Sequence, residues 1–548
     1  MNKSLRTIAV DLTPVLPGGE NGGAKIFVLE LLRHLCKIAP QTQFILLTQS
    51  LSHDELAYLD GPNMRRRMVV GPKQTNSLRQ RLIESFSRLA PRIHVKLPGI
   101  VNYLSEKLNT MLIQVGSGEL LRDMGVDLLF CPFTSPTYFE PGIPTVCTIY
   151  DLQYKTYPEF FAKEDVSHRE RTFLEACRRA TALAAISNYS RDSAISSANL
   201  NPARIRTIHL RMAQRIPYDV TYEKDILNRL GLTQKRYFLY PANFWKHKNH
   251  EMLFTAFGMA CHDGLPADIK LVCTGSPGER QEWLMRSASM MNLADRIIFP
   301  GFLPNADLAA LMAHCTGVIF PSLYEGFGLP VIEAMAAGVP VACSNTTSLP
   351  EVAADVAILF NPRIPSQIAQ AMILLLEDGA LCAQRIQSGR KRALEFSDTE
   401  LMAREYWELF EYSLTNEKHE NLMTGAFADG WSGPILKIQI APSKCAQTLE
   451  IEFLAPDWLP HPRLTVHTTK SGKKLGTPLF FNRGASAVLS LPLEPGGGFY
   501  EVKISPFFVP AKSGLGNDQR ELSTMLKRCN LLYDNGEIVQ LFPDKLDI

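Results

Sequence analysis

The sequence predicts an α/β protein with two Rossmann-like domains, followed by an antiparallel β-sandwich. Apolar strand segments alternate with helical segments in the first part of the chain, and the same alternation restarts after about residue 215. Such alternation builds a parallel sheet with helices on both faces. After Asn416 the strands have period two and are separated by glycine turns, which is typical of an antiparallel sandwich. We expect domains at 1–215 and 216–415, a linker at 416–432 and the sandwich at 433–548.

In the first domain, residues 6–11 read as a strand, 17–23 as a glycine loop and the segment from Ala24 onward as a helix. Apolar side chains recur at helical spacing and define a buried face: Ala24, Phe27, Val28, Leu31, Leu32 and Leu35. The further strands expected here are 43–48, 128–131, 144–149 and 182–186. Parallel strands of this kind place their carboxyl ends, and the loops that bind ligands, along one edge.

The second domain repeats this organisation. Its expected strands are 237–240, 270–274, 296–299, 318–320, 339–343 and 357–360, and a helix is expected at 399–413. In the third domain the period-two strands are 437–440, 449–453, 464–466, 488–491 and 500–504.

Composition narrows the class of protein. A chain of 548 residues with 46% hydrophobic and 20% charged residues is typical of a globular protein with several domains. A net charge of +2 argues against a dedicated nucleic-acid binder. The 11 cysteines form no C-x-x-C pair, so they indicate neither a zinc site nor a disulfide framework. The first apolar run is too short for a signal peptide, and no apolar stretch is long enough to span a bilayer. We therefore expect a cytoplasmic protein, at most peripheral on the inner face of the plasma membrane.

The most informative motif is a pair of glutamates, Glu325 and Glu333, with seven residues between them. An apolar strand precedes the pair, and Glu333 falls about one turn into the following helix. Gly326 and Gly328 lie in the turn, where glycine lets the backbone approach a ligand closely. Free amides at a helix start attract an anion such as a diphosphate, and the carboxylates can accept hydrogen bonds from sugar hydroxyls. The alternative is an ordinary strand–helix turn with solvated glutamates.

The stretch from His314 to Glu351 carries the same motif order as one family, including the segments 338–342 and 349–352. It resembles the retaining GT-B glycosyltransferases of the large group that includes sucrose synthases and bacterial mannosyltransferases. The resemblance implies two Rossmann-like domains that face a cleft, with the acceptor in the first domain and the nucleotide sugar in the second. It also implies that the helix at 399–413 crosses back to the first domain.

The family resemblance assigns roles to residues of this chain. Glu325 would hold the donor sugar and Glu333 the ribose, while Lys248 would bind the diphosphate and stabilise it as it leaves. The remaining donor contacts implied are Gly22, Gly23, Gly301, Gly326, Phe327 and Gly328. For each glycine the alternative is a plain turn, and for Lys248 a solvated loop lysine. Asn249, which follows Lys248, is expected to cap the next helix.

Two positions depart from the family pattern. The family commonly has an arginine where this chain has Asn243, so either another basic residue supplies the charge or the donor is held more weakly. Related enzymes commonly read His-Asp where this chain has Tyr150 and Asp151. Tyrosine can hydrogen-bond a sugar hydroxyl, but it does not titrate near neutral pH as histidine does. The alternatives are a tyrosine packed at the sheet end and an aspartate that caps a turn.

Residues 64–107 are strongly basic, with ten lysines and arginines against Glu84 and Glu106, a net charge of +8. Apolar residues from Leu82 to Ile93 interleave with these charges and suggest an amphipathic helix. A basic face of this kind can contact an anionic membrane or a lipid diphosphate carrier. The alternative is a solvated helix face of a soluble domain.

We therefore expect a retaining hexosyltransferase that needs no metal or other cofactor. It would transfer a sugar to a glycan or lipid-linked acceptor in bacterial polysaccharide assembly. The family resemblance favours mannose, with GDP-mannose as the donor. The chain has no D-x-D motif for a metal-chelated diphosphate. The sandwich resembles accessory modules of surface-polysaccharide enzymes, so 433–548 is a candidate docking surface for protein or glycan. The alternatives are a catalytically silent nucleotide-sugar-binding subunit and a sugar-nucleotide epimerase on the same fold.

Overall fold

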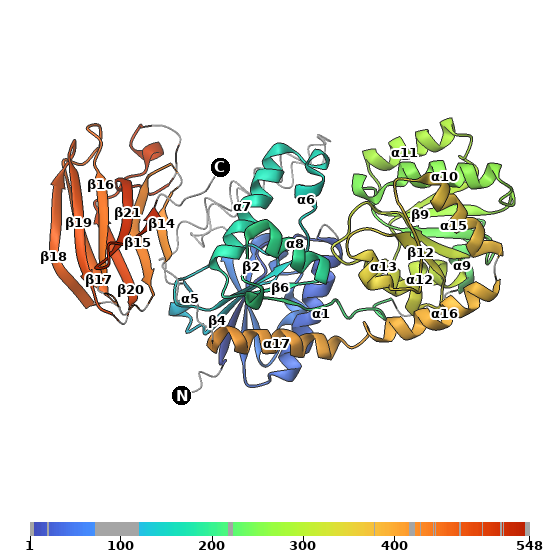
Figure 1. The fold of residues 1–548 in the computed structure, drawn as a ribbon, viewed down its shortest axis with the longest axis horizontal. Coiled ribbons are helices and arrows are strands. Elements are labelled where there is room, and N and C mark those ends of the chain that lie inside the picture. The colour runs from blue at the N-terminus through green and yellow to red at the C-terminus, as the bar shows by residue number, and fades with distance from the viewer. Residues whose placement is uncertain are drawn as a thin grey trace, which may run out of the picture.

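The computed structural model describes most of the chain and confirms the predicted α/β architecture (Figure 1). The described residues are 5–18, 21–71, 120–216, 223–377, 379–415, 422–427, 429–441, 443, 445, 447–470, 473–495, 497–515, 518 and 520–542. Two parallel sheets form Rossmann-like domains, and two antiparallel sheets form the C-terminal sandwich beside the first of them.

Within the described residues the first domain has a seven-stranded parallel sheet in the order β3-β2-β1-β4-β5-β6-β7. Its strands are β1 (Thr7–Asp11), β2 (Gln43–Gln49), β3 (Met64–Val70), β4 (Leu128–Cys131), β5 (Thr145–Ile149), β6 (Ala182–Ala185) and β7 (Ile205–Thr207). Its α-helices are α1 (Gly22–Ile38), α2 (Ser50–His53), α5 (Leu120–Asp123), α6 (Gln153–Thr156), α7 (Lys163–Arg179) and α8 (Asn188–Ala198). Shorter 3-10 turns lie at η1 (Ala57–Leu59), η2 (Pro158–Phe160) and η3 (Pro202–Arg204).

Helix α1 confirms its predicted buried face, because Phe27, Val28, Leu31, Leu32 and Leu35 are all fully buried. Neighbouring residues of β1 point to opposite faces of the sheet, so Ile8 and Val10 pack on the α1 side and Ala9 on the other. Gly22 and Gly23 are the first residues of α1, whereas the sequence suggested that the loop runs to Gly23. Gly22 has a φ of +53°, which favours glycine at this turn from loop into helix.

The second domain has, among the described residues, a six-stranded parallel sheet in the order β10-β9-β8-β11-β12-β13. Its strands are β8 (Tyr237–Pro241), β9 (Lys270–Thr274), β10 (Ile297–Gly301), β11 (Gly317–Phe320), β12 (Val341–Ser344) and β13 (Ile358–Phe360). Its helices are α9 (Glu223–Arg229), η5 (Lys246–Lys248), α10 (His250–His262), α11 (Glu279–Met290), α12 (Asn305–His314), α13 (Leu329–Ala336), α14 (Leu349–Ala353), α15 (Pro365–Glu377) and α16 (Gly379–Leu394).

Helix α17 (Thr399–Thr415) leaves the second domain and lies along the first, where it packs against α1, β5 and β6 (Figure 1). Tyr406 and Phe410 of α17 are fully buried and contact Phe130 of β4, at ring centroid distances of 5.6 and 5.1 Å. The hydrophobic cluster on this side of the first sheet is continuous with the core of the second domain. Helix α17 therefore joins the two domains into one packed unit.

The C-terminal domain is an antiparallel sandwich, with described strands in the orders β14-β15-β20-β17-β18 and β19-β16-β21-β22. These strands are β14 (Leu422–Ala426), β15 (Ser432–Ile440), β16 (Gln447–Leu454), β17 (Arg463–Lys470), β18 (Lys473–Asn482), β19 (Ser486–Leu493), β20 (Gly498–Ser505), β21 (Met525–Tyr533) and β22 (Ile538–Phe542), with the turn η6 (Pro510–Lys512). Strand β14 lies inside the segment 416–432 that we predicted as a linker. It pairs with β15, so the sandwich begins earlier than its sequence pattern indicated.

The start of the basic segment is part of the first sheet. Residues 64–70 form the edge strand β3, which pairs with β2. Arg66 of this strand is paired with Asp60 at 2.9 Å. The expected helix around Leu82 to Ile93, and the rest of 72–107, lie outside the described residues.

Candidate active site

Loops of the two domains meet where the carboxyl ends of both sheets face each other. A Cβ on Gly326 would collide with the carbonyl oxygen of Tyr150, so this loop of the second domain touches the first domain directly. A Cβ on Gly23 would lie 3.7 Å from Leu329, at the start of α13. Both predicted glycine-rich loops, one from each domain, therefore lie at the same interface.

Lys248 and Glu325 form an ion pair at this interface, with 2.6 Å between Nζ and Oε1. Each side chain is only 12% exposed. The Tyr240 hydroxyl donates to the carbonyl oxygen of Lys248 at 2.6 Å, which fixes the turn that carries the lysine. The pair places a cation and a carboxylate side by side, an arrangement that suits a ligand with both phosphate and hydroxyl groups.

Asn249 corrects the expectation of a helix cap. Its side chain makes no capping bond, and its backbone has a φ of +63° at the start of α10. Instead, its Nδ2 donates to the carbonyl oxygens of Pro321 at 3.0 Å and Pro362 at 2.8 Å. Asn249 therefore ties the lysine turn to the loop that carries Glu325.

Two hydroxyl side chains form hydrogen bonds with the backbone of the loop from Glu325 to Gly328. Thr347 accepts from the Glu325 N–H at 3.1 Å, and Ser348 donates to the carbonyl oxygens of Glu325 and Phe327 at 2.9 and 3.0 Å. The Phe327 ring is buried, so this residue offers only its backbone to a ligand. In the part of the chain that the structure describes, the N–H groups of residues 326–328 meet no hydrogen-bond acceptor. They are available to an anion at the start of α13.

Glu333 is 4% exposed and lies on α13, one turn beyond the loop. Its Oε1 accepts a hydrogen bond from Nε of Arg215 at 2.8 Å, and Nη2 of Arg215 forms an ion pair with the same oxygen at 2.7 Å. Burial raises the pKa of Glu333, and the charge and hydrogen bonds of Arg215 oppose that rise. Arg215 comes from the connection between the domains, and nothing in its sequence context signalled this contact.

A neighbouring loop, at Gly275 and Ser276, contacts both Asn243 and Gly301. The Asn243 Oδ1 accepts from the Ser276 N–H at 3.0 Å, and the Gly275 N–H donates to the carbonyl oxygen of Gly301 at 3.1 Å. Gly301 has a φ of +81°, which favours glycine. Asn243 follows β8, Gly275 and Ser276 follow β9, and Gly301 ends β10, so these residues form one group at the carboxyl edge of the second sheet.

Tyr150 and Asp151 come from the end of β5. The Tyr150 ring packs edge-on against Phe27, with ring centroids 6.1 Å apart, and its buried hydroxyl has no hydrogen-bond partner among the described residues. Burial raises the pKa of Asp151, while the Gln153 N–H lowers it by donating to Oδ1 at 3.0 Å. The charges of Glu325 and Lys248 both act on Asp151, so this carboxylate belongs to the same electrostatic site.

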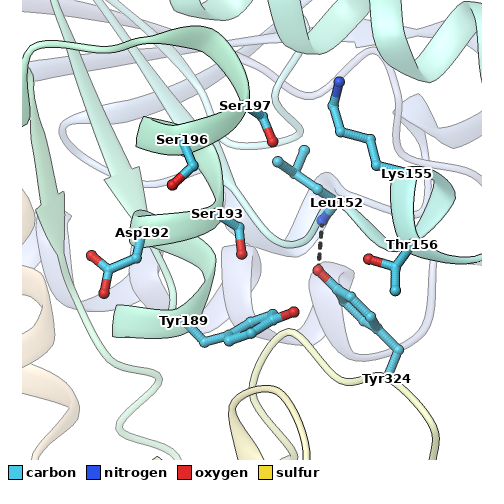
Figure 2. Close-up of a pocket in the computed structure, with 9 residues that line it drawn as sticks. All are labelled: Leu152, Lys155, Thr156, Tyr189, Asp192, Ser193, Ser196, Ser197 and Tyr324. Atoms are coloured by element: carbon cyan, nitrogen blue, oxygen red, sulfur yellow. Dashed lines mark hydrogen bonds between the residues drawn. The ribbon is translucent and has the colours of Figure 1, made fainter.

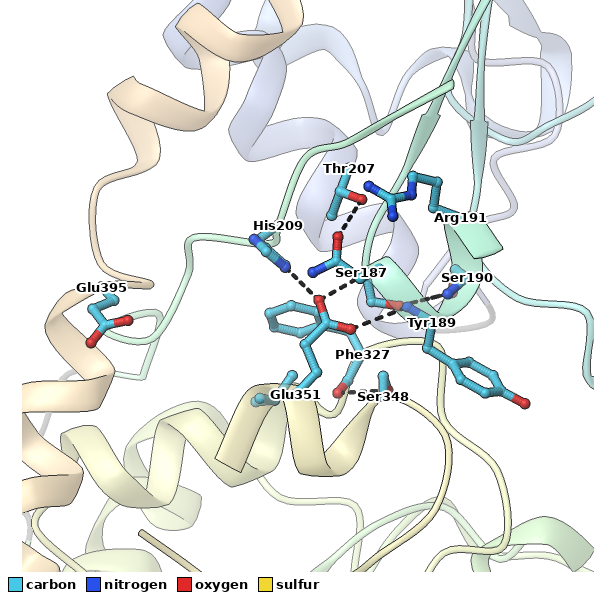
Figure 3. A network of polar contacts seen from close by, with 12 residues as sticks. Ser187, Tyr189, Ser190, Arg191, Thr207, His209, Phe327, Ser348, Glu351 and Glu395 are labelled. Carbon is cyan, nitrogen blue, oxygen red and sulfur yellow. Dashed lines mark hydrogen bonds and ion pairs between the residues drawn. The ribbon is translucent and has the colours of Figure 1, made fainter. Parts of the chain in front are cut away.

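Glu351 makes an interdomain contact that sequence reasoning did not foresee (Figure 3). Its carboxylate accepts from the N–H groups of Asn188 and Tyr189, at 2.8 and 3.1 Å, at the start of α8 in the first domain. It also pairs with Nε2 of His209 at 2.7 Å. Glu351 stood in the family motif at 349–352, but its partners lie more than a hundred residues earlier in the chain.

Comparison with known proteins finds similarity to glycosyltransferases. Residues 223–392 match the family described as glycosyl transferases group 1. The chain is 30% identical to O-antigen chain mannosyltransferase B of Escherichia coli over 257 residues, which is 46% of this chain and 66% of that protein. It is 30% identical to the serotype-specific mannosyltransferase WbdA of Escherichia coli over 264 residues, 46% of this chain and 32% of that protein. The matches thus span just under two thirds of the first relative and about a third of the second.

Solved structures share the two-domain fold. The crystal structure of Anabaena Alr3699/HepE in complex with UDP and glucose aligns with a TM-score of 0.54 at 17% identity, covering 74% of this chain and 100% of that chain. WaaG, a glycosyltransferase involved in lipopolysaccharide biosynthesis, aligns with a TM-score of 0.51 at 15% identity, covering 73% of this chain and 99% of that one. These similarities establish the GT-B fold for the two Rossmann-like domains. Among the described helices, none is long and apolar enough to cross a membrane.

Proposed function

We propose that this protein transfers a hexose from a nucleotide-diphospho-sugar to a glycan or lipid-linked acceptor, because residues 223–392 match the group 1 glycosyltransferases. The donor we propose is GDP-mannose, since the Escherichia coli relatives are named as mannosyltransferases. The name of the first relative also motivates a role in bacterial polysaccharide assembly. The cytoplasmic side of the membrane is the location that we propose.

The observation that carries this proposal is the buried ion pair of Lys248 and Glu325, 2.6 Å apart beside the free amides of residues 326–328. Lys248 and these amides would hold the diphosphate and stabilise the negative charge that develops as it leaves. Glu325 would accept hydrogen bonds from the donor sugar. The Asn249 side chain, bonded to the carbonyl oxygens of Pro321 and Pro362, holds the lysine turn beside the loop that carries Glu325. This cation and these amides supply the positive charge that a metal ion would otherwise provide, so we propose a metal-independent reaction.

We further propose that the reaction retains the configuration of the sugar, as in the family that the motif resembles. The acceptor hydroxyl would attack from the face that the diphosphate leaves, and a phosphate oxygen would take its proton. Glu333 would bind the ribose hydroxyls after Arg215 turns away, because Arg215 contacts its Oε1 through one hydrogen bond and an ion pair. Gly22, Gly23, Asn243 and Gly301 remain proposed donor contacts, and Tyr150 and Asp151 proposed acceptor contacts.

Donor binding to the Lys248→Ala variant tests the site. GDP and GDP-mannose should each bind more weakly by about 1.5–3 kcal/mol, the range for a charged hydrogen bond, and guanosine should bind as before. Lys246→Ala is the matched control, since Lys246 is exposed on the same turn and should bind all three ligands like the parent. Calorimetry measures these affinities. Equal losses for guanosine and GDP would contradict phosphate binding by Lys248.

The anomeric configuration of the product tests retention, and its formation in EDTA tests metal independence. NMR of the glycoside formed from GDP-mannose should show the α-anomer in the presence of EDTA, because no step requires a metal. A β-linked product would contradict retention, and activity that EDTA abolishes and Mg²⁺ or Mn²⁺ restores would contradict metal independence.

Two observations favour a silent nucleotide-sugar-binding subunit as the second candidate. Arg215 neutralises Glu333, and Asn243 leaves the diphosphate region without the second basic residue that the family commonly has. A silent subunit would bind GDP-mannose but neither transfer nor slowly hydrolyse it. Measurement of GDP release with and without acceptor separates the two candidates.

A contact with anionic membrane through 64–107 remains a separate proposal, which rests on the charge of that segment. Cosedimentation with anionic vesicles, lost at high salt, would support it.

A further inference from the structure

A hydroxyl-lined cavity of about 370 Å³ lies beside the loop that carries Glu325 (Figure 2). Eight of its nine lining residues come from the first domain, and the ninth, Tyr324, directly precedes Glu325. The lining residues are Leu152, Lys155, Thr156, Tyr189, Asp192, Ser193, Ser196, Ser197 and Tyr324. The volume is within the range of small-ligand sites.

We propose that this cavity is a subsite for a neutral sugar unit of the acceptor glycan. The proposal rests on the proposed glycosyl transfer and names where the acceptor chain lies. The lining favours acceptor over donor, because it includes none of the residues proposed to contact the donor.

The side chains of one face of α8 supply most of the hydrogen-bonding capacity. Tyr189, Ser193, Ser196 and Ser197 recur at helical spacing along this face. Serines in other helices of this protein donate back to the carbonyl four residues earlier, as Ser167 and Ser287 do. The hydroxyls of Ser193, Ser196 and Ser197 make no such bond among the described residues. They can therefore both donate to and accept from the hydroxyls of a sugar.

The floor of the cavity is rigid and aromatic. The Tyr324 hydroxyl accepts from the Leu152 N–H at 3.2 Å, and its ring stands edge-on to Tyr189, with centroids 5.8 Å apart. Tyr324 is 2% exposed, so it is fixed before any ligand arrives. Since Tyr324 belongs to the second domain, the cavity is complete only when the two domains are in contact.

The charges in the cavity exclude an anionic ligand. Lys155 is the one lysine or arginine among the lining residues, and its Nζ is paired with Glu170 at 2.5 Å. Asp192 would repel a phosphate, and it is paired with Arg191 at 2.8 Å. A phosphate or nucleotide would therefore find no free cation among these side chains, whereas a polyhydroxyl ligand finds several unpaired hydroxyls.

Acceptor kinetics of the full chain test this subsite. In the double variant Ser193→Ala/Ser197→Ala, the KM for an α-linked mannotriose acceptor should rise about tenfold or more, because two hydroxyl hydrogen bonds are lost. The kcat and the affinity for GDP-mannose should stay close to the parent, since neither serine touches the donor groups. Thr156→Val, which removes a hydroxyl at nearly constant shape, should raise the KM in the same way. Ser289→Ala, at an exposed position of α11, is the matched control and should leave KM unchanged.

Direct binding separates this inference from the proposed function. Saturation-transfer NMR with mannotriose should show contact in the parent protein and a weaker signal in the double variant, whether or not GDP-mannose is turned over. Inorganic phosphate should not compete. Parental KM and parental mannotriose binding in the double variant would overturn the subsite, even if transfer itself is established. Competition by phosphate would overturn it as well.

Discussion

At the residue scale, Asp11 shows how the end of a strand can carry an uncompensated charge. It is the last residue of β1 and is 1% exposed. Thr13 donates to its Oδ1 through N–H and Oγ1, at 3.0 and 2.6 Å, while Oδ2 has no partner among the described residues. Burial raises the pKa of Asp11 to about 6 against these bonds. A polar residue at the carboxyl end of the first strand could have been singled out from sequence, but its burial could not.

We predict that Asp11→Asn stabilises the protein at pH 7.5. The pKa of Asp11 is about 6 in the folded state and near 3.8 in the unfolded state. The folded state therefore binds more protons between these values, and stability falls as the pH rises through that window. Asparagine keeps an oxygen for Thr13 and removes the buried charge, with an expected gain on the order of 3 kcal/mol.

The measurement is the difference in Tm between variant and parent at pH 7.5 and 4.5. The difference should be positive at pH 7.5 and much smaller at pH 4.5, where Asp11 of the parent is protonated. Asp54→Asn, at an exposed position of the same domain, should leave the Tm nearly unchanged. A destabilised Asp11→Asn variant at pH 7.5 would show that the carboxylate has a partner that we did not identify.

The residues of the candidate site differ in how far sequence could predict them. Lys248 and Glu325 follow apolar strands in a family motif, so both could be predicted as site residues from the sequence. The structure brings Nζ of Lys248 within 2.6 Å of Oε1 of Glu325. The contact of Arg215 with Glu333 could not be predicted from the sequence, because a lone arginine between domains has no spacing that points to Glu333. Gly326 was read as a phosphate cradle, whereas the close approach of Tyr150 gives a further, steric reason for glycine.

At the element scale, the start of α8 shows how one domain completes a helix of the other. The side chain of Ser187 accepts from the Ser190 N–H at 3.1 Å, and Glu351 accepts from the N–H groups of Asn188 and Tyr189. The free amides of the first turn are thus satisfied from two domains. Sequence predicted that a helix follows β6 but could not predict this cap, because its acceptor comes from α14.

Glu351→Gln should destabilise the protein near neutral pH by about 1.5–3 kcal/mol, the range for a charged hydrogen bond. Burial acts to raise the pKa of Glu351, but His209 and the two N–H groups outweigh burial and lower it. A lowered pKa means that the stabilisation is fully present above the ordinary glutamate pKa of about 4.3 and is lost as the pH falls through the lowered value.

Tm measured from pH 7 to pH 4 checks this sign. The difference in Tm between Glu351→Gln and the parent should be constant down to about pH 5. It should then become smaller, because Glu351 of the parent loses its charge. Glu395→Gln is the control, since Glu395 is 55% exposed and its pair with Arg392 should contribute little. A gap that widens on acidification would contradict the proposed cap.

At the scale of the whole molecule, sequence predicted three domains but not their contacts. Alternating strands and helices are local patterns, and they located most strands to within a few residues. The docking of the sandwich depends on single long-range contacts, such as Arg122 stacked 4.2 Å from the Phe499 ring centroid and the Gly142 N–H bonded to Gln439 Oε1 at 2.9 Å. Such contacts have no periodicity, so they cannot be read from one sequence.

The contact between the two Rossmann-like domains gives the last prediction. A Cβ on Gly326 would collide with the carbonyl oxygen of Tyr150, directly after β5, and this backbone cannot move aside as a flexible side chain could. We expect Gly326→Ala to push the domains apart. The second domain should still fold, so GDP should still bind through Lys248. Transfer should fall at least a hundredfold, on the order of 3 kcal/mol, because the acceptor and donor groups no longer meet.

Small-angle X-ray scattering and transfer rates together test this separation of the domains. The radius of gyration of Gly326→Ala should exceed that of the parent, and mannotriose binding should weaken because Tyr324 leaves the cavity. Gly379→Ala is the matched control, since a Cβ there meets no atom within 4 Å, and it should match the parent in both measurements. A Gly326→Ala protein with parental radius and parental activity would show that the two loops do not touch in solution, and the closed interface would lose its role in assembling the site.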